Sequence, residues 1–196
     1  MRLNSIIPRI WMKILNIKCG KELQLSGWPF IFRFPNAQIS FGDRCSINSN
    51  FLSNLLGLYQ RTIVIARNEA IIKIGDKVGI SGSTIYAREK IEIGNHTLIG
   101  ANCKIMDNDF HPTDPGARLN NDPKAIGVKP IYIGNNVFIG CNTIILKGTV
   151  FGDNCVIGAG SVVHGCFGEN LVIAGNPARV IKKVDNEENF SGRCSG

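Results

Sequence analysis

One histidine in this sequence stands among residues that could carry out proton transfer. His111 follows Asp107 and Asp109 in the segment DNDFHP, which spans residues 107–112. An imidazole titrates near pH 6.5, so it can take a proton from a hydroxyl or an amine and later return it to a leaving group. Either aspartate could orient the ring and stabilise its cation, and a turn-forming role is equally open for both. His111 is therefore the candidate general base.

The elements that must position this histidine follow a period of six residues. Apolar anchors return at intervals of six, glycine often follows the anchor, and a compact residue often stands four positions after it. The anchors are Ile74, Ile80, Ile93, Ile99, Ile105, Ile133, Ile139, Ile145, Phe151, Ile157 and Val163. A short fixed period predicts a solenoid in which each unit buries its apolar face on the next. Three units per coil would form a triangular prism with coils about 4.8 Å apart.

The repeat divides the chain into segments of an all-β protein. We expect a non-repetitive, partly helical N-terminal segment over residues 1–38, a β-helix over 39–184 and a flexible tail over 185–196. Residues 107–130 interrupt the repeat with four prolines and many Asn, Asp and Gly residues. Such a segment cannot be regular strand, so it predicts a long loop extruded from the solenoid. Long ordered loops are usually functional.

The beginning of the chain predicts an amphipathic helix. Apolar residues recur there at intervals of three and four, and Arg2, Arg9 and Lys13 stand among them. This helix can pack on the solenoid. Alternatively, residues 1–18 can make a peripheral contact with an anionic membrane surface, which basic residues near Trp11 would favour. We expect a cytoplasmic protein, with the inner face of the membrane as the alternative location.

Composition excludes several classes of protein. The 196 residues carry a formal net charge of +7, but the basic residues form no dense run and few aromatics lie among them, so nucleic acid is not an expected partner. No uninterrupted apolar stretch reaches about 18 residues, so no membrane span is expected. The seven cysteines include no CxxC pair. Cys45, Cys103 and Cys155 occupy the compact repeat position and are expected to be buried, which indicates a reducing compartment.

The repeat and the loop together resemble a known family. The segments IGANCKIMDNDFHP (99–112), IGNNVFIGCNTIILKGTVFGDNCVIGAGSVV (133–163) and VIAGNPARVIKKV (172–184) resemble the hexapeptide-repeat acyltransferases, in particular the maltose, galactoside and polysaccharide O-acetyltransferase branch. The resemblance covers roughly residues 74–184. It implies a left-handed parallel β-helix that assembles as a homotrimer and binds acetyl-CoA in the groove between neighbouring subunits.

The same resemblance assigns roles to individual residues. It implies that His111, at the HP motif, is the general base in direct transfer of an acetyl group from acetyl-CoA to a sugar or polysaccharide precursor, with no metal required. Ser81 and Ser83 match positions that contact the acceptor. The positions that match donor-binding residues are Phe138, Cys141, Ala159, Gly160, His164, Arg179, Lys182 and Lys183.

The donor-binding positions have simpler interpretations as well. Arg179 and Lys182 match residues that meet the CoA phosphates, but they could also belong to a solvated basic strand. Phe138 matches a position where relatives often carry Trp near the acetyl group, but its smaller ring could instead serve core or interface packing. Cys141 is expected to line the donor site rather than act as a nucleophile, since direct transfer needs none. Gly165 stands where relatives usually have Lys, which leaves phosphate binding more dependent on the later basic residues.

Three other functions remain open at this stage. N-acetylation of an amino sugar is the main alternative enzyme activity, because no residue in the sequence distinguishes a hydroxyl acceptor from an amine acceptor. A γ-carbonic-anhydrase-like protein needs three histidines converging on a metal. The three here, His96, His111 and His164, lack the closely spaced downstream pair of that class. A non-catalytic β-helix scaffold is the third alternative, and the HP and AGNPAR motifs argue against it.

Overall fold

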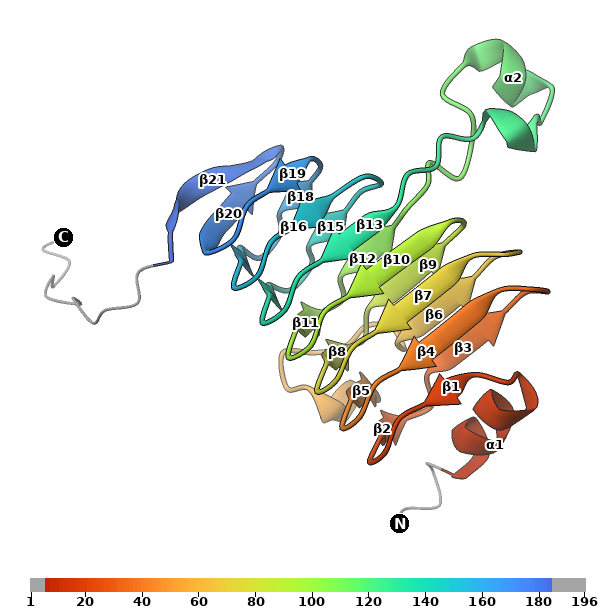
Figure 1. The fold of residues 1–196 in the computed structure, drawn as a ribbon, viewed down its shortest axis with the longest axis vertical. Coiled ribbons are helices and arrows are strands. Elements are labelled where there is room, and N and C mark those ends of the chain that lie inside the picture. Colours follow the sequence, from red (N-terminus) through yellow and green to blue (C-terminus); the bar gives the residue numbers. More distant parts are fainter. Residues whose placement is uncertain (1–5, 185–196) are drawn as a thin grey trace, which may run out of the picture.

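A computed structural model describes residues 6–184 as a three-sided stack of short strands, from which one loop projects (Figure 1). Each coil adds one strand to each of three sheets, A, B and C, in that order along the chain. Sheet A contains β1 (Lys18–Cys19), β4 (Gln38–Phe41), β7 (Ile71–Ile74), β10 (Lys90–Ile93), β13 (Ile131–Ile133), β16 (Val150–Phe151) and β19 (Cys166–Phe167).

The other two sheets complete the prism. Sheet B contains β2 (Gln24–Gly27), β5 (Ser46–Ser49), β8 (Gly79–Ser81), β11 (Leu98–Ala101), β14 (Phe138–Ile139), β17 (Val156–Ile157), β20 (Leu171–Gly175) and β21 (Ala178–Lys183). Sheet C contains β3 (Phe30–Arg33), β6 (Ile63–Ala66), β9 (Thr84–Ala87), β12 (Lys104–Met106), β15 (Ile144–Ile145) and β18 (Val162–Val163). We name the prism edges by the sheets they join: A–B, B–C and C–A. The strands stack in parallel, and β21 closes the described chain by pairing antiparallel with β20.

The six-residue period produces the core. Strand side chains alternate between the two faces of a sheet, so one anchor per strand points inward and stacks on the anchor of the next coil. Ile99 pairs with Ile139 and Ile139 with Ile157, and all three are buried. The compact fourth positions are buried as well: the thiol of Cys103 is fully buried and donates to the carbonyl of Gly140, one coil on, at 3.1 Å. Burial raises the pKa of this thiol, which keeps it protonated.

A ladder of side-chain oxygens holds the A–B edge together. Asn95 Oδ1 accepts the backbone N–H of Asp76 at 2.8 Å, and Asn135 Oδ1 accepts that of Asn95 at 2.9 Å. Asp153 Oδ1 continues the ladder by accepting the N–H of Asn135 at 2.7 Å. His96 belongs to this edge, where its φ of 59° lies in the left-handed region. It is a corner residue, far along the perimeter from His111.

Stacking begins earlier than the sequence indicates. The segment expected to be non-repetitive up to residue 38 contains the whole first coil, since β1, β2 and β3 pair in parallel with β4, β5 and β6. The boundary placed at residue 39 is therefore wrong. The first coil lacks the glycine and isoleucine pattern because its lower edge has no coil beneath it. Helix α1 (Ile6–Ile14) covers that end instead, and the expectations for residues 1–5 and 185–196 lie outside the described residues.

The expected fold class, an all-β solenoid with a helical N-terminal segment and one extruded loop, is confirmed. The loop leaves the C–A edge after Met106 and returns at Ile131. It holds the short helix α2 (Pro115–Leu119) and the 3-10 turn η3 (Pro123–Ala125), and a similar turn η2 (Phe51–Ser53) follows β5. Among residues 6–184, no helix has the length and apolar character that crossing a bilayer requires.

Candidate active site

The stem of the extruded loop is fixed by a buried carboxylate. Asp107 is fully buried, and its side chain accepts the backbone N–H groups of Arg88, Glu89 and Lys90 from the preceding coil, each at 2.8 Å. Asn108 also donates to it at 3.1 Å. These four donors occupy the carboxylate, so the expectation that Asp107 could orient the His111 ring is wrong. The residue ties the loop to the stack instead.

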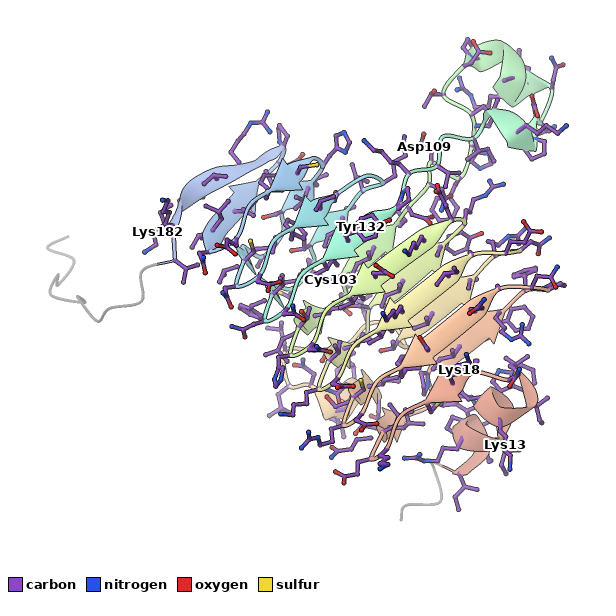
Figure 2. All side chains as sticks on the ribbon, viewed as in Figure 1. Lys13, Lys18, Cys103, Asp109, Tyr132 and Lys182 are labelled. Carbon is purple, nitrogen blue, oxygen red and sulfur yellow. The ribbon has the colours of Figure 1, made fainter. Side chains whose placement is uncertain are left out.

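The second aspartate is held by a lysine that the sequence analysis did not single out. The Nζ of Lys147, on the C–A edge of the next coil, binds both carboxylate oxygens of Asp109. The carboxylate of Asp109 therefore faces Lys147, and its contact with His111 is made by the backbone, where His111 N–H donates to Asp109 O at 2.7 Å. Asp109 does not orient the imidazole through its side chain; it positions the turn that carries it. Figure 2 shows Asp109 at the base of the loop.

His111 itself is exposed at the start of the loop. The preceding residue, Phe110, adopts a φ of 62°, and its N–H donates to Asn108 Oδ1 at 3.0 Å. The Phe110 ring contacts the ring of Tyr86 on sheet C, with centroids 4.7 Å apart. This turn is fixed on both sides, so the imidazole of His111 is presented to solvent from a well-anchored backbone. Exposure lets the ring reach a proton on a bound substrate.

One predicted donor-site residue lies on the same edge as His111. His164 follows β18, and its Nδ1 lies 3.1 Å from the carbonyl oxygen of Lys147. Asp109, Lys147 and His164 therefore form a column along the C–A edge over successive coils. Lys147 could have been suspected from the sequence only by its place in the repeat, two residues after the anchor Ile145 at a corner. Its partner, however, comes from the loop, which has no period.

The remaining predicted donor-site residues lie elsewhere on the prism. Phe138 points outward from sheet B and is 49% exposed. Cys141 is half-buried on the B–C edge, and Ala159 and Gly160 are exposed one coil further on the same edge. The N–H of Gly160 donates to Cys141 O at 2.8 Å, and Gly160 has a φ of 70°, which glycine adopts without strain. These four residues form one continuous surface.

The predicted phosphate-binding residues stand at the end of this surface. Arg179, Lys182 and Lys183 lie on β21, the last strand of sheet B, and all three are exposed. Figure 2 shows Lys182 near the end of the described chain, well separated from Asp109. The basic strand thus continues the Phe138–Gly160 surface toward the C-terminal end of the stack.

The predicted acceptor residues do not lie beside His111. Ser83 is fully buried; its hydroxyl lies 2.8 Å from the carbonyl of Gly100 and accepts the N–H of Cys103 at 2.8 Å. The assignment of Ser83 to acceptor contact is therefore wrong, because its hydroxyl is used within the coil. Ser81 is only 8% exposed and accepts from Asn48 at 3.2 Å, at the B–C end of β8. Within one chain, neither serine reaches the C–A edge.

The structure thus divides the predicted site between two edges. His111, Asp109 and His164 lie on the C–A edge, whereas Cys141 and Ala159 lie on the B–C edge. Sheet C separates these edges, and a four-residue strand of that sheet, such as β9, spans about 13 Å. Two hollows of ≈ 370 and ≈ 330 Å³ on the described surface border the N-terminal end and sheet A, and His111 lines neither. A single chain does not bring the base and the donor surface together.

The histidines are also divided. His96 lies on the A–B edge, and His111 and His164 lie on the C–A edge. Over residues 6–184, no group of three His, Cys, Asp or Glu side chains is arranged to hold a metal ion. Within this chain, the C–A edge carries the imidazoles of His111 and His164 and the Asp109–Lys147 ion pair.

Comparisons with known proteins identify the class to which this parallel β-helix with its extruded loop belongs, the hexapeptide-repeat acyltransferases. Residues 130–164 match the family described as the hexapeptide repeat of succinyl-transferase. A proposed lipopolysaccharide biosynthesis O-acetyl transferase of Escherichia coli K12, WbbJ, is 33% identical over 170 residues, 80% of each chain. The galactoside O-acetyltransferase of the same organism is 38% identical over 105 residues, 54% of this chain and 50% of that one.

A solved structure supports the same assignment. A galactoside acetyltransferase in complex with coenzyme A matches 94% of this chain and 74% of its own, with a TM-score of 0.54 and 26% identity. The chain belongs to the hexapeptide-repeat acetyltransferases, and its fold is the left-handed parallel β-helix of that family. The resemblance noted in the sequence is therefore confirmed.

Proposed function

We propose that this protein transfers the acetyl group of acetyl-CoA to a hydroxyl group of a sugar or a polysaccharide precursor, with His111 as the general base. The observation that carries the proposal is the exposed His111 side chain on a turn fixed by Asp107 and Asp109. The names of the relatives support the reaction class, since they include O-acetyl transferases of galactosides and of lipopolysaccharide biosynthesis. The coenzyme A of the similar galactoside acetyltransferase supports the donor.

The proposed reaction needs one base and no covalent enzyme intermediate. His111 takes the proton of the acceptor hydroxyl while the oxygen attacks the thioester carbonyl. The tetrahedral intermediate then expels the CoA thiolate, which takes the proton back from the imidazolium, so that the products are the acetyl ester and free CoA thiol. The imidazole thus acts as the base in the first step and, once protonated, as the acid in the second.

The donor surface fits a long ligand that ends in phosphates. Cys141, Ala159 and Gly160 lie along the B–C edge, where their small side chains would leave room for the pantetheine arm. Arg179 and Lys183 then place positive charge at its C-terminal end, where the phosphates of CoA would bind. Phe138 stands beside this path on sheet B.

A homotrimer would complete the site. The outer face of sheet C is mostly apolar, whereas that of sheet A carries charged and polar residues such as Lys73, Lys90 and Glu92. The apolar outward residues of sheet C are Phe30, Phe32, Ile63, Ile65, Tyr86, Met106, Ile144, Leu146 and Val162, with Thr84 and Lys104 among them. An exposed apolar face of this size favours contact with another subunit. Packing it against a neighbour would carry His111 of one chain toward the donor surface of the next.

We also propose a cytoplasmic location. The six cysteines in residues 6–184 are free thiols, which suits a reducing compartment. The N-terminal segment adds a peripheral membrane contact to this proposal.

The test measures release of CoA thiol from acetyl-CoA in the presence of a panel of glycosides, oligosaccharides and amino sugars. We expect His111→Asn to lower the rate by about 10²-fold or more, the usual loss for a general base. His96→Asn is the matched control, because the same substitution is made on the A–B edge at a left-handed position that asparagine tolerates. Full activity of His111→Asn would overturn the proposed mechanism. Transfer to amino sugars alone would replace the hydroxyl acceptor by an amine.

A further inference from the structure

Helix α1 closes the N-terminal end of the prism. Pro8 and Met12 are its buried residues, and Met12 joins the hydrophobic core together with Leu23 and Ile31 of the first coil. The indole N–H of Trp11 donates to the carbonyl of Ile31 at 3.0 Å. The helix therefore lies across the open end of the stack, which Figure 1 shows below β1 and β3.

The outer side of the same helix is also apolar. Ile7, Ile10 and Ile14 are 52%, 54% and 69% exposed. At 100° per residue, all three project at least about 140° away from the buried Met12. Trp28, in the first coil, is another 47% exposed apolar residue at this end. A helix that needed only to cover the core would have polar residues on this side.

Basic residues surround this apolar stripe. Residues 6–33 contain five basic side chains and one acidic side chain. Arg9 and Arg33 bind backbone carbonyls, which leaves the exposed Lys13, Lys18 and Lys21 as the outward charges. Within the described part of the chain, no carboxylate forms an ion pair with these three lysines. Figure 2 shows Lys13 and Lys18 at the same end of the molecule.

The position of the stripe limits what can cover it. Subunits that pack side by side through sheet C, as in the trimer proposed above, leave the ends of their prisms free. A threefold axis along the stack would also place three copies of α1 at one end of the assembly. End-to-end contact between two such assemblies would bring the lysines around α1 of one assembly against those of the other, and like-charge repulsion opposes this contact.

We propose that the outer face of α1, formed by Ile7, Ile10 and Ile14 with the surrounding lysines, docks the protein on an anionic membrane surface. The isoleucines would enter the boundary between headgroups and acyl chains while the lysines meet anionic headgroups, as in other interfacial helices. The geometry deepens the proposed peripheral contact by assigning it to one helix face. The docking face is distinct from the acetyl-transfer residues, so the two proposals can fail separately.

The test is sedimentation of the full chain with vesicles of phosphatidylcholine alone or mixed with phosphatidylglycerol. We expect binding to the anionic vesicles that weakens at high salt. Ile7→Ser, Ile10→Ser and Ile14→Ser combined should reduce this binding at least about tenfold, because each removes apolar surface from the interface. Lys13→Glu and Lys18→Glu should each reduce it about fivefold or more. Leu52→Ser, Leu55→Ser and Leu56→Ser combined are the matched control, since they remove three apolar side chains from an even more exposed patch elsewhere.

The outcomes separate the alternatives. Loss of vesicle binding in the α1 variant but not in the leucine variant, with unchanged thermal unfolding and acetyl transfer in both, supports the proposal. Equal binding of the wild type to zwitterionic and anionic vesicles, or no binding to either, overturns it. A lower mass of the α1 variant in light scattering also overturns it, because the face would then lie between copies of this chain.

Discussion

The ammonium group of Lys147 binds both carboxylate oxygens of Asp109, and this ion pair joins the C–A edge of the stack to the turn that carries His111. Both side chains are only partly buried, so the pair adds little to global stability. Its consequence is positional, because it fastens the turn to the next coil and adds to the stem hydrogen bond from Asp109 N–H to Gly127 O at 3.0 Å. Lys147 therefore positions the turn that carries His111, the proposed base.

Removing this ion pair should slow catalysis without unfolding the protein. We expect Lys147→Met to lower kcat about tenfold with a smaller change in KM, because a displaced base weakens proton transfer more than binding. Asp109→Asn should have a similar effect, and the double variant should be no worse than either single one. Lys90→Met is the control, since it breaks the Lys90–Glu92 ion pair on sheet A. Steady-state kinetics measure kcat and KM of each variant. A wild-type kcat in Lys147→Met would refute the positioning role.

Glycine at the repeat corner is the second testable feature. A Cβ added at Gly140 would lie 2.5 Å from the backbone nitrogen of Ala159 in the next coil, and backbone cannot move aside cheaply. We expect Gly140→Ala to lower the free energy of unfolding by about 1–3 kcal/mol, the usual cost of overpacking. Gly168→Ala is the matched control, because nothing lies within 4 Å of its added Cβ. Urea unfolding of both variants at one protein concentration checks this, and equal midpoints would contradict it.

The repeat explains why so much of the fold is predictable from the sequence. Inward positions such as Ile99 and Ile139 are filled by the same residue types in each coil, because each coil repeats the same packing problem. The first coil was missed because another coil packs on only one of its sides and α1 covers the other, so Leu23 fills the compact position that Cys45 occupies in the second coil. A sequence period arises only where the same packing environment recurs from coil to coil. The end of the stack has an environment that occurs once, so no period marks it.

The candidate site was less predictable for a related reason. The position of His111 in the loop follows from the motif, but the partners of Asp107 and Asp109 lie in coils on either side, at Lys90 and Lys147. Such contacts depend on how an aperiodic loop folds back on the stack. The assignment of Ser83 failed because a polar residue in the compact repeat position serves backbone groups inside the coil.

The side-chain ladder on the A–B edge predicts a pH effect on stability. Hydrogen bonds from the backbone and side chain of Asn135 lower the pKa of the Asp153 carboxyl below its usual range. A lowered folded-state pKa means that the stabilisation is complete above the unfolded-state pKa of about 3.9 and is lost as the pH falls through the folded value. We expect the Tm of the wild type to fall more steeply below about pH 4 than that of Asp153→Asn, whose amide oxygen accepts at every pH. Parallel Tm profiles would contradict the assignment.

The last prediction tests whether the base and the donor surface come from different chains. His111→Asn removes the base on the C–A edge, and Ala159→Trp fills the donor path on the B–C edge, so each variant alone should be inactive. The two are co-expressed with different tags, and mixed trimers are purified through both. A ring that contains both chains has one junction where an intact His111 edge meets an intact Ala159 edge, so mixed trimers should regain about one third of the wild-type rate. If both residues served a site within one chain, every site would carry a defect and mixing would restore nothing. Mixed wild-type trimers prepared with the same two tags give the reference rate.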